Sequence, residues 1–224
     1  MKNIITVLLA DDHAMVRAGL HSLINTESDI EVIGEAENGR EAVEMATSLN
    51  PDIIIMDIAM PTLNGFEATR QIIKSTPAAK IFILSAHGDD AYVEQAMTIG
   101  ASGFLIKQSA AHILPVAIRQ IYNGSEFFSP TISRRLLQQQ HRDQQRGDDN
   151  TPQLSSREME VLQLVAEGKA NKQTADELNI SIKTVEKHRQ SLMDKLNIHD
   201  TAGLTRYAIA AGVIESSVQV TIIE

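Results

Sequence analysis

The chain reads Ile53-Ile-Ile-Met-Asp57-Ile-Ala-Met-Pro61-Thr-Leu-Asn-Gly65 about a quarter of the way along its 224 residues. Four consecutive large apolar residues predict a short strand that is buried on both faces, and Asp57 comes directly after it. Comparable apolar runs recur on both sides of this stretch, at residues 4–10, 30–33, 81–84 and 103–106. The sequence therefore predicts five short buried strands.

Helix-length amphipathic segments separate these runs, near residues 13–25, 39–49, 64–75, 90–100 and 110–123. Strands that alternate with helices predict βαβ units, right-handed crossovers and a parallel sheet. The expected fold is a doubly wound α/β domain over residues 1–125, with a five-stranded parallel sheet of strand order 2-1-3-4-5. In such a sheet, ligands bind beyond the carboxyl ends of the strands, at the point where the strand order reverses.

Polar side chains follow four of the predicted strands. Asp11 and Asp12 end the first strand, Asp57 the third, Ser85 the fourth and Lys107 the fifth. Each alone is ordinary, because an Asp or Ser after a strand usually caps a turn or a helix. Together they would converge in one pocket, where a divalent cation relieves the repulsion between carboxylates. Since Mg²⁺ prefers oxygen ligands and is often shared with a phosphate, the pattern favours phosphoryl transfer to an aspartate.

Four motifs resemble the receiver domains of bacterial response regulators, and the match covers about residues 4–124. They are the stretch quoted above, Val7-Leu-Leu-Ala-Asp11-Asp12-His13, Leu84-Ser85-Ala86 and Gly100-Ala-Ser-Gly-Phe104-Leu-Ile-Lys107. The resemblance implies that Asp57 accepts a phosphoryl group. It also implies that Asp12 and Asp57 bind Mg²⁺ directly, together with the backbone carbonyl of Ala59, while Asp11 acts through water.

The same resemblance implies a switch. Ser85 and Lys107 would contact the phosphoryl oxygens, and Ser85 and Phe104 would move together when phosphate arrives, with Phe104 turning inward. Two residues depart from the family pattern: Phe104 stands where a tyrosine is common, and Gln108 stands where many receivers have proline. Neither departure touches the acceptor chemistry.

The chain changes character after about residue 125. Residues 126–153 are predicted to be a linker, because 138–152 are almost wholly polar. From 154 to 214 the apolar periodicity is helical, which predicts a small all-α domain of four helices. Ser155 and Glu158 form an expected capping box for the first, and the others are expected near 172–178, 182–196 and 201–212. The tail, residues 215–224, has no interpretation.

The third of these helices has the features of a DNA-reading helix. Ile182, Val185, Leu192 and Leu196 share one predicted apolar face, while long polar side chains occupy the others. By itself this pattern is more often a solvated helix face, but a short helix and a tight turn precede it, as in a helix-turn-helix unit.

Residues 154–212 resemble the LuxR-type DNA-binding domain, and the whole chain resembles a NarL/FixJ-type response regulator. Its motifs here include Leu154-Ser-Ser-Arg-Glu158 and Ser181-Ile-Lys-Thr-Val185-Glu-Lys-His188. The resemblance implies binding to promoter DNA and a sensor histidine kinase as partner, and it gives six candidate DNA contacts: Ser181, Lys183, Thr184, Lys187, His188 and Arg189. It also implies a homodimer when phosphorylated, paired through the fourth helix at Leu204, Tyr207, Ala208 and Ala211; packing within the domain is the alternative for that helix.

Composition sets limits on these hypotheses. The formal net charge of −9 argues against a nucleic-acid binder, but residues 181–206 carry a local net charge of +2. The chain has no cysteine, which excludes disulfides, thiolate metal sites and a cysteine nucleophile. No signal peptide or membrane span is recognisable, so we expect a cytoplasmic protein. The seven histidines lack close ligand spacing and are expected to be structural or solvated. His13 is the one histidine that lies beside the acidic pair, so it is the first candidate for a different role.

Two other functions remain open on the sequence alone. The α/β domain could belong to a phosphatase or phosphotransferase, which would turn over small phosphate esters many times. The C-terminal helices could instead bind protein, as in a phosphorylation-controlled adaptor. The favoured hypothesis is a signalling phosphoacceptor that is not an enzyme.

Overall fold

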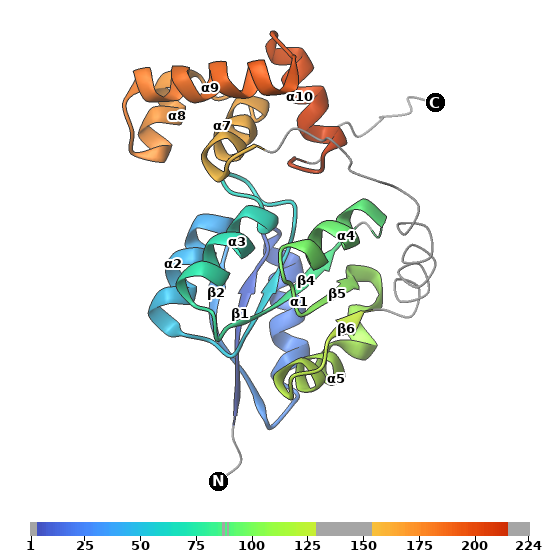
Figure 1. Ribbon diagram of the computed structural model, residues 1–224. Coiled ribbons are helices and arrows are strands. Elements are labelled where there is room, and N and C mark those ends of the chain that lie inside the picture. The colour runs from blue at the N-terminus through green and yellow to red at the C-terminus, as the bar shows by residue number, and fades with distance from the viewer. Residues whose placement is uncertain (1–3, 87, 89, 129–153, 215–224) are drawn as a thin grey trace, which may run out of the picture. The chain divides into compact units, whose positions relative to one another are not determined.

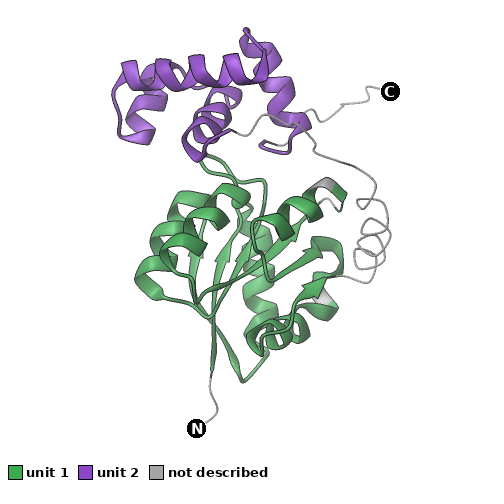
Figure 2. Cartoon of the chain, in the orientation of Figure 1, with its two compact units in different colours: residues 1–151 green, residues 152–224 purple. Residues whose placement is uncertain are grey.

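The protein is described by a computed structural model that covers residues 4–86, 88, 90–128 and 154–214. The chain divides into two compact units, residues 1–151 and residues 152–224 (Figure 2). We describe each unit by itself. The predicted tail at 215–224 and most of the predicted linker lie outside the described residues.

A parallel sheet forms the centre of the first unit (Figure 1). Its strands are β1 (Ile5–Ala10), β2 (Ile30–Ala36), β3 (Ile53–Met56), β4 (Lys80–Ser85), β5 (Gly103–Ile106) and β6 (Phe127–Phe128). They lie in the order β2-β1-β3-β4-β5-β6, and every neighbouring pair is parallel. The predicted fold class and the order 2-1-3-4-5 are confirmed, and the sheet has one strand more than expected.

The sixth strand lies in the segment that the sequence assigned to a linker. Phe127 pairs with Gly103, and Phe128 pairs with Phe104. The Phe127 ring also meets Phe82 edge-on, with centroids 6.0 Å apart. Two residues are too few for a periodicity to show, so only their packing reveals the strand. The domain boundaries 1–125, 126–153 and 154–214 stay predictions. Because β6 pairs with β5, residues 127–128 belong to the sheet of the first unit and not to a linker.

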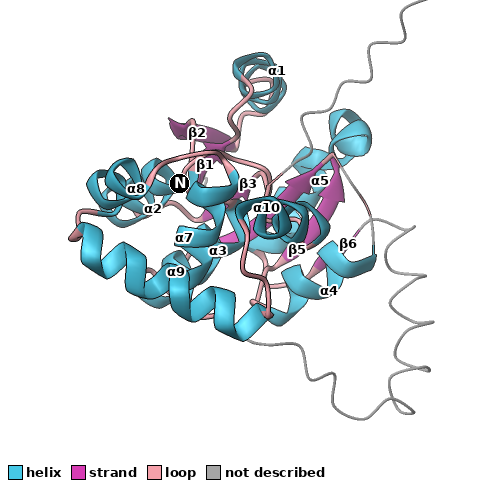
Figure 3. Ribbon diagram, turned by 90° about the horizontal axis from the view of Figure 1, so that it is seen from above, coloured by secondary structure: helices cyan, strands magenta, loops and turns pink. Residues whose placement is uncertain are grey.

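Two layers of helices cover the sheet. The helices are α1 (Ala14–Ile24), α2 (Gly39–Leu49), α3 (Gly65–Ser75), α4 (Asp90–Thr98) and α5 (Ala110–Tyr122). One apolar cluster joins residues of α2, α3 and α4 to the sheet, and a second joins residues of α1 and α5 to its other face. The strands accordingly lie between α1 on one side and α2 and α3 on the other (Figure 3). This double cover explains why the inner strands, such as β3, are continuous apolar runs, whereas the edge strand β2 also contains Glu31 and Glu35.

Side chains at the ends of the helices fix where they begin. Asn38 accepts hydrogen bonds from the backbone at the start of α2, and Asn64 does the same for α3 at Glu67. The Asn64 cap lies seven residues after Asp57, so it also fixes the end of the loop that leaves β3.

The second unit is a bundle of α7 (Ser156–Ala166), α8 (Asn171–Leu178), α9 (Ile182–Leu196) and α10 (Thr201–Ala210). The predicted capping box is present, since Ser155 and Glu158 bond to each other's backbone. Val185 and Leu192 of α9 are fully buried in the core. Ile182, the first residue of α9, is 45% exposed, so the buried part of the predicted apolar face begins at Val185.

No helix in the described residues is long and apolar enough to cross a membrane.

Candidate functional site

The predicted site residues gather at the carboxyl ends of the strands in the first unit. Asp11 follows β1, Asp57 follows β3, and Ser85 is the last residue of β4. Lys107 follows β5 and begins a short 3₁₀ turn, Lys107–Ser109. Ser85 pairs in register with Ile106, the residue before Lys107. Asp11, Asp57 and Ser85 are each buried.

The lysine lies between two of the carboxylates. Lys107 Nζ is 2.8 Å from Asp11 Oδ2 and 2.9 Å from Asp57 Oδ2. Asp12 is on the same side of the site, with its Oδ1 2.7 Å from His13 Nδ1. One ligand atom from each of Asp11, Asp12, His13 and Asp57 lies within 4.8 Å of the others. The structure thus brings together the acids that the sequence placed on different strands.

Backbone contacts hold Asp57 in place. Its amide donates to the carbonyl of Ala10 at 2.8 Å, and its Oδ1 accepts from the amide of Ile58 at 2.9 Å. Gly65 packs against the Asp57 carbonyl so closely that a Cβ there would collide with it. The second carboxylate oxygen, Oδ2, faces Lys107. The Asp57 carboxylate is therefore fixed by one oxygen and directed toward the pocket by the other.

Burial and charge shift the pKa values of this pair. Burial raises the pKa of Asp57 from 3.8 to about 6, and the charges of Asp11 and Asp12 add to the increase while Lys107 opposes it. For Lys107, burial would lower the pKa, but the charge of Asp57 and the bonds to Asp57 and Asp11 outweigh burial and raise it. The lysine is therefore a permanent cation beside a carboxylate that ionises near neutral pH.

The carboxylates fit a divalent cation. Asp11 Oδ2 lies 2.8 Å from Lys107 Nζ, and Asp12 Oδ1 lies 2.7 Å from His13 Nδ1. Such oxygens, converging with Asp57, are the donors that Mg²⁺ prefers. Ala59 lies half-buried in the loop two residues after Asp57.

The predicted switch residues lie on neighbouring strands. Phe104 is fully buried in the cluster beneath α2, α3 and α4, where Met56, Ile83 and Val93 also pack. Its ring is therefore already inward in this structure. Gln108, the second departure from the family pattern, lies exposed within the 3₁₀ turn.

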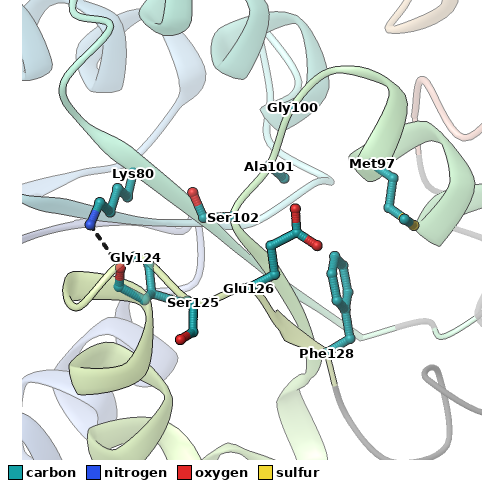
Figure 4. Close-up of a pocket in the computed structure, with 10 residues that line it drawn as sticks. Lys80, Met97, Gly100, Ala101, Ser102, Gly124, Ser125, Glu126 and Phe128 are labelled. Atoms are coloured by element: carbon teal, nitrogen blue, oxygen red, sulfur yellow. Dashed lines mark hydrogen bonds between the residues drawn. The ribbon is translucent and has the colours of Figure 1, made fainter.

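The first unit also has a pocket near the opposite ends of strands β4 and β5. A pocket of about 300 Å³ is lined by residues that include Lys80, Ser102, Glu126 and Phe128 (Figure 4). Lys80 Nζ donates to the carbonyls of Ile121 and Tyr122, at 2.9 and 2.8 Å. The lysine is thereby satisfied within the fold, and none of the predicted site residues lines this pocket.

In the second unit, α9 presents a polar face to solvent. Lys183 and Lys187, one turn apart, are both exposed, whereas Thr184 and His188 are half-buried. Ser181 caps the helix: its Oγ accepts from the Thr184 amide and lies 2.8 Å from Thr184 Oγ1. The predicted contacts exposed to a ligand are therefore the two lysines and Ser181.

Arg189 differs from the other predicted DNA contacts. Its guanidinium donates to Asn171 Oδ1 at 3.1 Å and to Thr201 Oγ1 at 2.7 Å, so it joins α9 to the beginnings of α8 and α10. Gln190 was not among the predicted contacts, yet it is exposed on the same face as Lys183 and Lys187. Helical spacing with Lys187 is the signal that could have identified it.

The predicted dimer residues on α10 divide into two groups. Leu204 and Ala208 are fully buried in the core of their own unit, so they offer no surface to a partner. Tyr207 and Ala211 are half-buried, and Ile209 is 37% exposed.

Comparison with known proteins agrees with this division into units. Residues 7–119 match the family model of the response regulator receiver domain, and residues 152–208 match that of the bacterial regulatory proteins, luxR family. The response regulator protein VraR of Staphylococcus saprophyticus is 36% identical over 94% of this chain and 99% of its own.

Two solved structures are also similar. RcsB from Salmonella enterica serovar Typhimurium, bound to promoter P1flhDC in the presence of the phosphomimetic BeF3−, matches with a TM-score of 0.59 and 28% identity, over 94% of this chain and 100% of that one. A structure of two RcsB dimers bound to two parallel DNAs matches with a TM-score of 0.57 and 28% identity, over 92% and 98%.

Proposed function

Since the chain belongs to the two-component response regulators that join a receiver domain to a LuxR-type DNA-binding domain, we propose that Asp57 is its phosphoacceptor. A sensor histidine kinase donates the phosphoryl group, and the phosphorylated chain binds promoter DNA as a dimer to regulate transcription. The observation that carries this proposal is the convergence of Asp11, Asp57 and Lys107 within ion-pair distance. A cytoplasmic location follows from both partners.

The chemistry is transfer to a carboxylate oxygen. Oδ2 of Asp57 attacks the phosphorus, a P–O bond forms, and the bond from phosphorus to the donor nitrogen breaks as the donor histidine leaves. Lys107 offsets negative charge on the transferred oxygens, and the Ser85 hydroxyl donates a hydrogen bond to one of them. Although burial raises the pKa of Asp57 to about 6, the carboxylate is still mostly ionised at neutral pH, as a nucleophile must be.

Mg²⁺ would be held by Asp12, Asp57 and the carbonyl of Ala59, with Asp11 acting through water. When bound, it supplies positive charge to the phosphoryl oxygens. The acceptor is consumed once per event, so the protein acts as a signalling component rather than an enzyme.

The phosphoryl group biases a two-state equilibrium of the receiver. Ser85 moves toward the phosphate, and the space behind it is filled by Phe104. The inward ring of Phe104 in this structure supports the active arrangement as an accessible one. Phosphate can shift the population only by its differential stabilisation of that arrangement.

The DNA contacts are proposed to centre on α9. Lys183 and Lys187 bind phosphates or base edges, together with Ser181 and Thr184 at the start of the helix and His188 near its middle. Gln190 is added because it is exposed. Arg189 acts through the position of α9 instead. Tyr207 and Ile209 of α10, with Ala211 at its C-cap, form the proposed dimer surface.

Replacement of the acceptor tests the first half of this proposal. With acetyl phosphate and Mg²⁺, the intact chain should gain one phosphoryl group, and D57N should gain none. Asp176, exposed on α8, gives a matched control, since D176N should be labelled as the natural chain is. Persistent labelling of D57N would remove Asp57 from the role, and many rounds of phosphate release per chain would favour the enzyme alternative.

Salt dependence tests the second half. If Lys187 contacts a DNA phosphate, K187A should weaken binding and reduce the slope of log affinity against log salt by roughly one unit. K74A removes an exposed lysine of the first unit and should leave the slope unchanged. Binding that does not depend on salt, or no binding to any duplex, would favour the adaptor alternative.

A further inference from the structure

A buried arginine of α1 joins three elements at the carboxyl end of the sheet. The side chain of Arg17 is only 8% exposed. Its Nη1 donates to the backbone carbonyl of Asp11 at 2.7 Å, and its Nη2 donates to Glu37 Oε1 at 2.5 Å. Its Nε is 3.5 Å from Glu35 Oε2. The guanidinium therefore connects α1 to the residue that follows β1 and to the end of β2.

The Asp11 carbonyl needs a donor that the sheet does not supply. Asp11 lies between the end of β1 at Ala10 and the start of α1 at Ala14. Its amide donates to the carbonyl of Ala36 at 3.1 Å, whereas its carbonyl accepts from Arg17 at 2.7 Å. Since Asp11 is only 2% exposed, loss of the arginine would leave a buried carbonyl without that bond, which is costly.

This hydrogen bond acts on the peptide between the two acids of the site. The peptide that joins Asp11 to Asp12 is planar, so a fixed oxygen also fixes the direction in which the chain continues to Asp12. The Asp11 carboxylate is held separately, because its Oδ1 accepts from the His13 amide at 2.9 Å and its Oδ2 lies 2.8 Å from Lys107 Nζ. Arg17 thus affects the carboxylates through their position.

Arg119 makes comparable bonds at the other end of the sheet. This arginine of α5 donates from Nε to Asp29 Oδ2 at 2.8 Å and from Nη2 to Glu27 Oε2 at 2.5 Å. Asp29 directly precedes β2, and its carbonyl accepts from the amide of Ile5 at the start of β1. Arg119 therefore also joins a helix to the sheet through two acids, but it does so far along β1 from the acidic site.

We propose that Arg17 is a positioning residue of the phosphoacceptor site: by holding the Asp11 carbonyl, it keeps Asp11 and Asp12 in the arrangement that binds Mg²⁺. The proposal rests on the proposed function, because it concerns the same site. Charge alone predicts the opposite effect, since a guanidinium near the carboxylates repels a second cation and its removal should tighten Mg²⁺ binding. The direction of the change in Mg²⁺ affinity therefore separates positioning from charge.

The test compares three variants of the intact chain. R17M removes the guanidinium but keeps a long unbranched side chain. R17K keeps the charge beside Glu35 and Glu37 but loses the planar fork that donates in two directions at once. R119M is the matched control. Mg²⁺ is titrated by calorimetry into each variant, with circular dichroism to establish the folded fraction, and labelling of Asp57 by acetyl phosphate is then measured over a range of Mg²⁺ concentrations.

We expect R17M to weaken Mg²⁺ binding by about tenfold, as loss of a residue that orients metal ligands commonly does. R17K should weaken it by about threefold or more, and R119M should stay within about twofold of the natural chain. The Mg²⁺ concentration for half-maximal labelling should rise in the same proportions, while the labelling rate at saturating Mg²⁺ stays within about twofold for every variant.

Unchanged or tighter Mg²⁺ binding in folded R17M would overturn the proposal. If R17M does not fold, R17K decides in the same way, since it retains the buried cation. An equal loss of Mg²⁺ affinity in R119M would also overturn it, because the effect would then come from general destabilisation. Failure of the phosphoacceptor proposal looks different: the natural chain would not be labelled at any Mg²⁺ concentration, and the calorimetric comparison would still judge Arg17.

Discussion

Asp57 carries a charge that its surroundings oppose. An aspartate whose pKa is raised by folding, here from 3.8 to about 6, binds its proton more tightly in the folded state than in the unfolded state. Below about pH 4 both states are protonated and the effect is absent. Between pH 4 and pH 6 the folded state loses stability relative to the unfolded state, and above pH 6 the loss is complete.

The first prediction follows from that cost. Without divalent metal at neutral pH, D57N should raise the free energy of unfolding of the first unit by about 1–3 kcal/mol. The gain should shrink when the same pair is compared at pH 4.5, and Mg²⁺ should stabilise the natural chain more than the variant. Urea unfolding of the intact chain at both pH values measures this. A gain of equal size at both pH values would show that the carboxylate charge is not its source.

Two glycines with opposite surroundings give the second prediction. Gly65 begins α3, and a Cβ there would collide with the carbonyl of Asp57, so G65A should destabilise the first unit by about 1–3 kcal/mol and slow labelling. Gly19 lies within α1 with nothing within 4 Å, so G19A should stabilise by about 0.5–1 kcal/mol through helix propensity. Thermal unfolding separates the two, and a stabilising G65A would contradict the close approach.

Sequence reasoning located the candidate site residues because each follows an apolar strand. The convergence of Asp11, Asp12, Asp57 and Lys107 needed only the topology of a parallel sheet. It could not give the contact of His13 with the acids, which depends on the path of one loop. Nor could it show that Arg189 forms hydrogen bonds within its own domain. An arginine at this position of the helix looks the same in the sequence whether it binds DNA or a neighbouring helix.

At the scale of elements, a buried carboxylate joins α7 to α9. Glu158 accepts from Ser155 in the capping box, from Ser191 Oγ at 2.7 Å and from Lys195 Nζ at 2.6 Å. Burial alone would raise the pKa of Glu158, but the bonds from Lys195, Ser191 and Ser155 outweigh burial and lower it from 4.5 to about 2. The resulting stability is fully present above pH 4.5 and is lost as the pH falls toward 2.

The third prediction concerns this contact between helices. E158Q keeps the shape of the side chain but removes its charge, and it should destabilise the second unit by about 2 kcal/mol at neutral pH. E186Q, at an exposed position of α9, should change stability little. Hydrogen exchange of α7 and α9 amides in the intact chain measures the second unit alone. Unchanged protection in E158Q would mean that the pairing contributes no net stability.

Elements were predictable where their apolar pattern extends over several residues, as a continuous run in a strand or a helical period in a helix. The five longer strands and all nine described α-helices lie close to their expected positions, because apolar runs and helical periods extend over whole elements. Strand β6 has two residues and depends on Phe82 and Gly103 for its packing. On α10, the sequence could not tell an apolar face that builds a core from one that binds a partner, and Leu204 and Ala208 belong to the core.

At the scale of the whole molecule, charge is distributed unevenly along the chain. The chain has a net charge of −9, yet residues 181–206 carry five Lys and Arg against three Asp and Glu. The excess of acidic residues outside that segment repels DNA at long range, so a favourable encounter depends on the short basic face of α9. In the proposed dimer, two such faces would contact DNA together, which doubles the contact without changing the net charge of each chain.

The last prediction joins the two units. If phosphorylation favours a dimer, beryllofluoride with Mg²⁺ should raise the affinity of the intact chain for a duplex with two half-sites, spaced by about one helical turn, by roughly tenfold. A duplex with one half-site should gain much less, because only dimerisation links the second contact to the first. D57N should bind both duplexes equally with and without the mimic. A similar gain on both duplexes would place the effect within one chain, and no gain on either would separate the acceptor site from DNA binding.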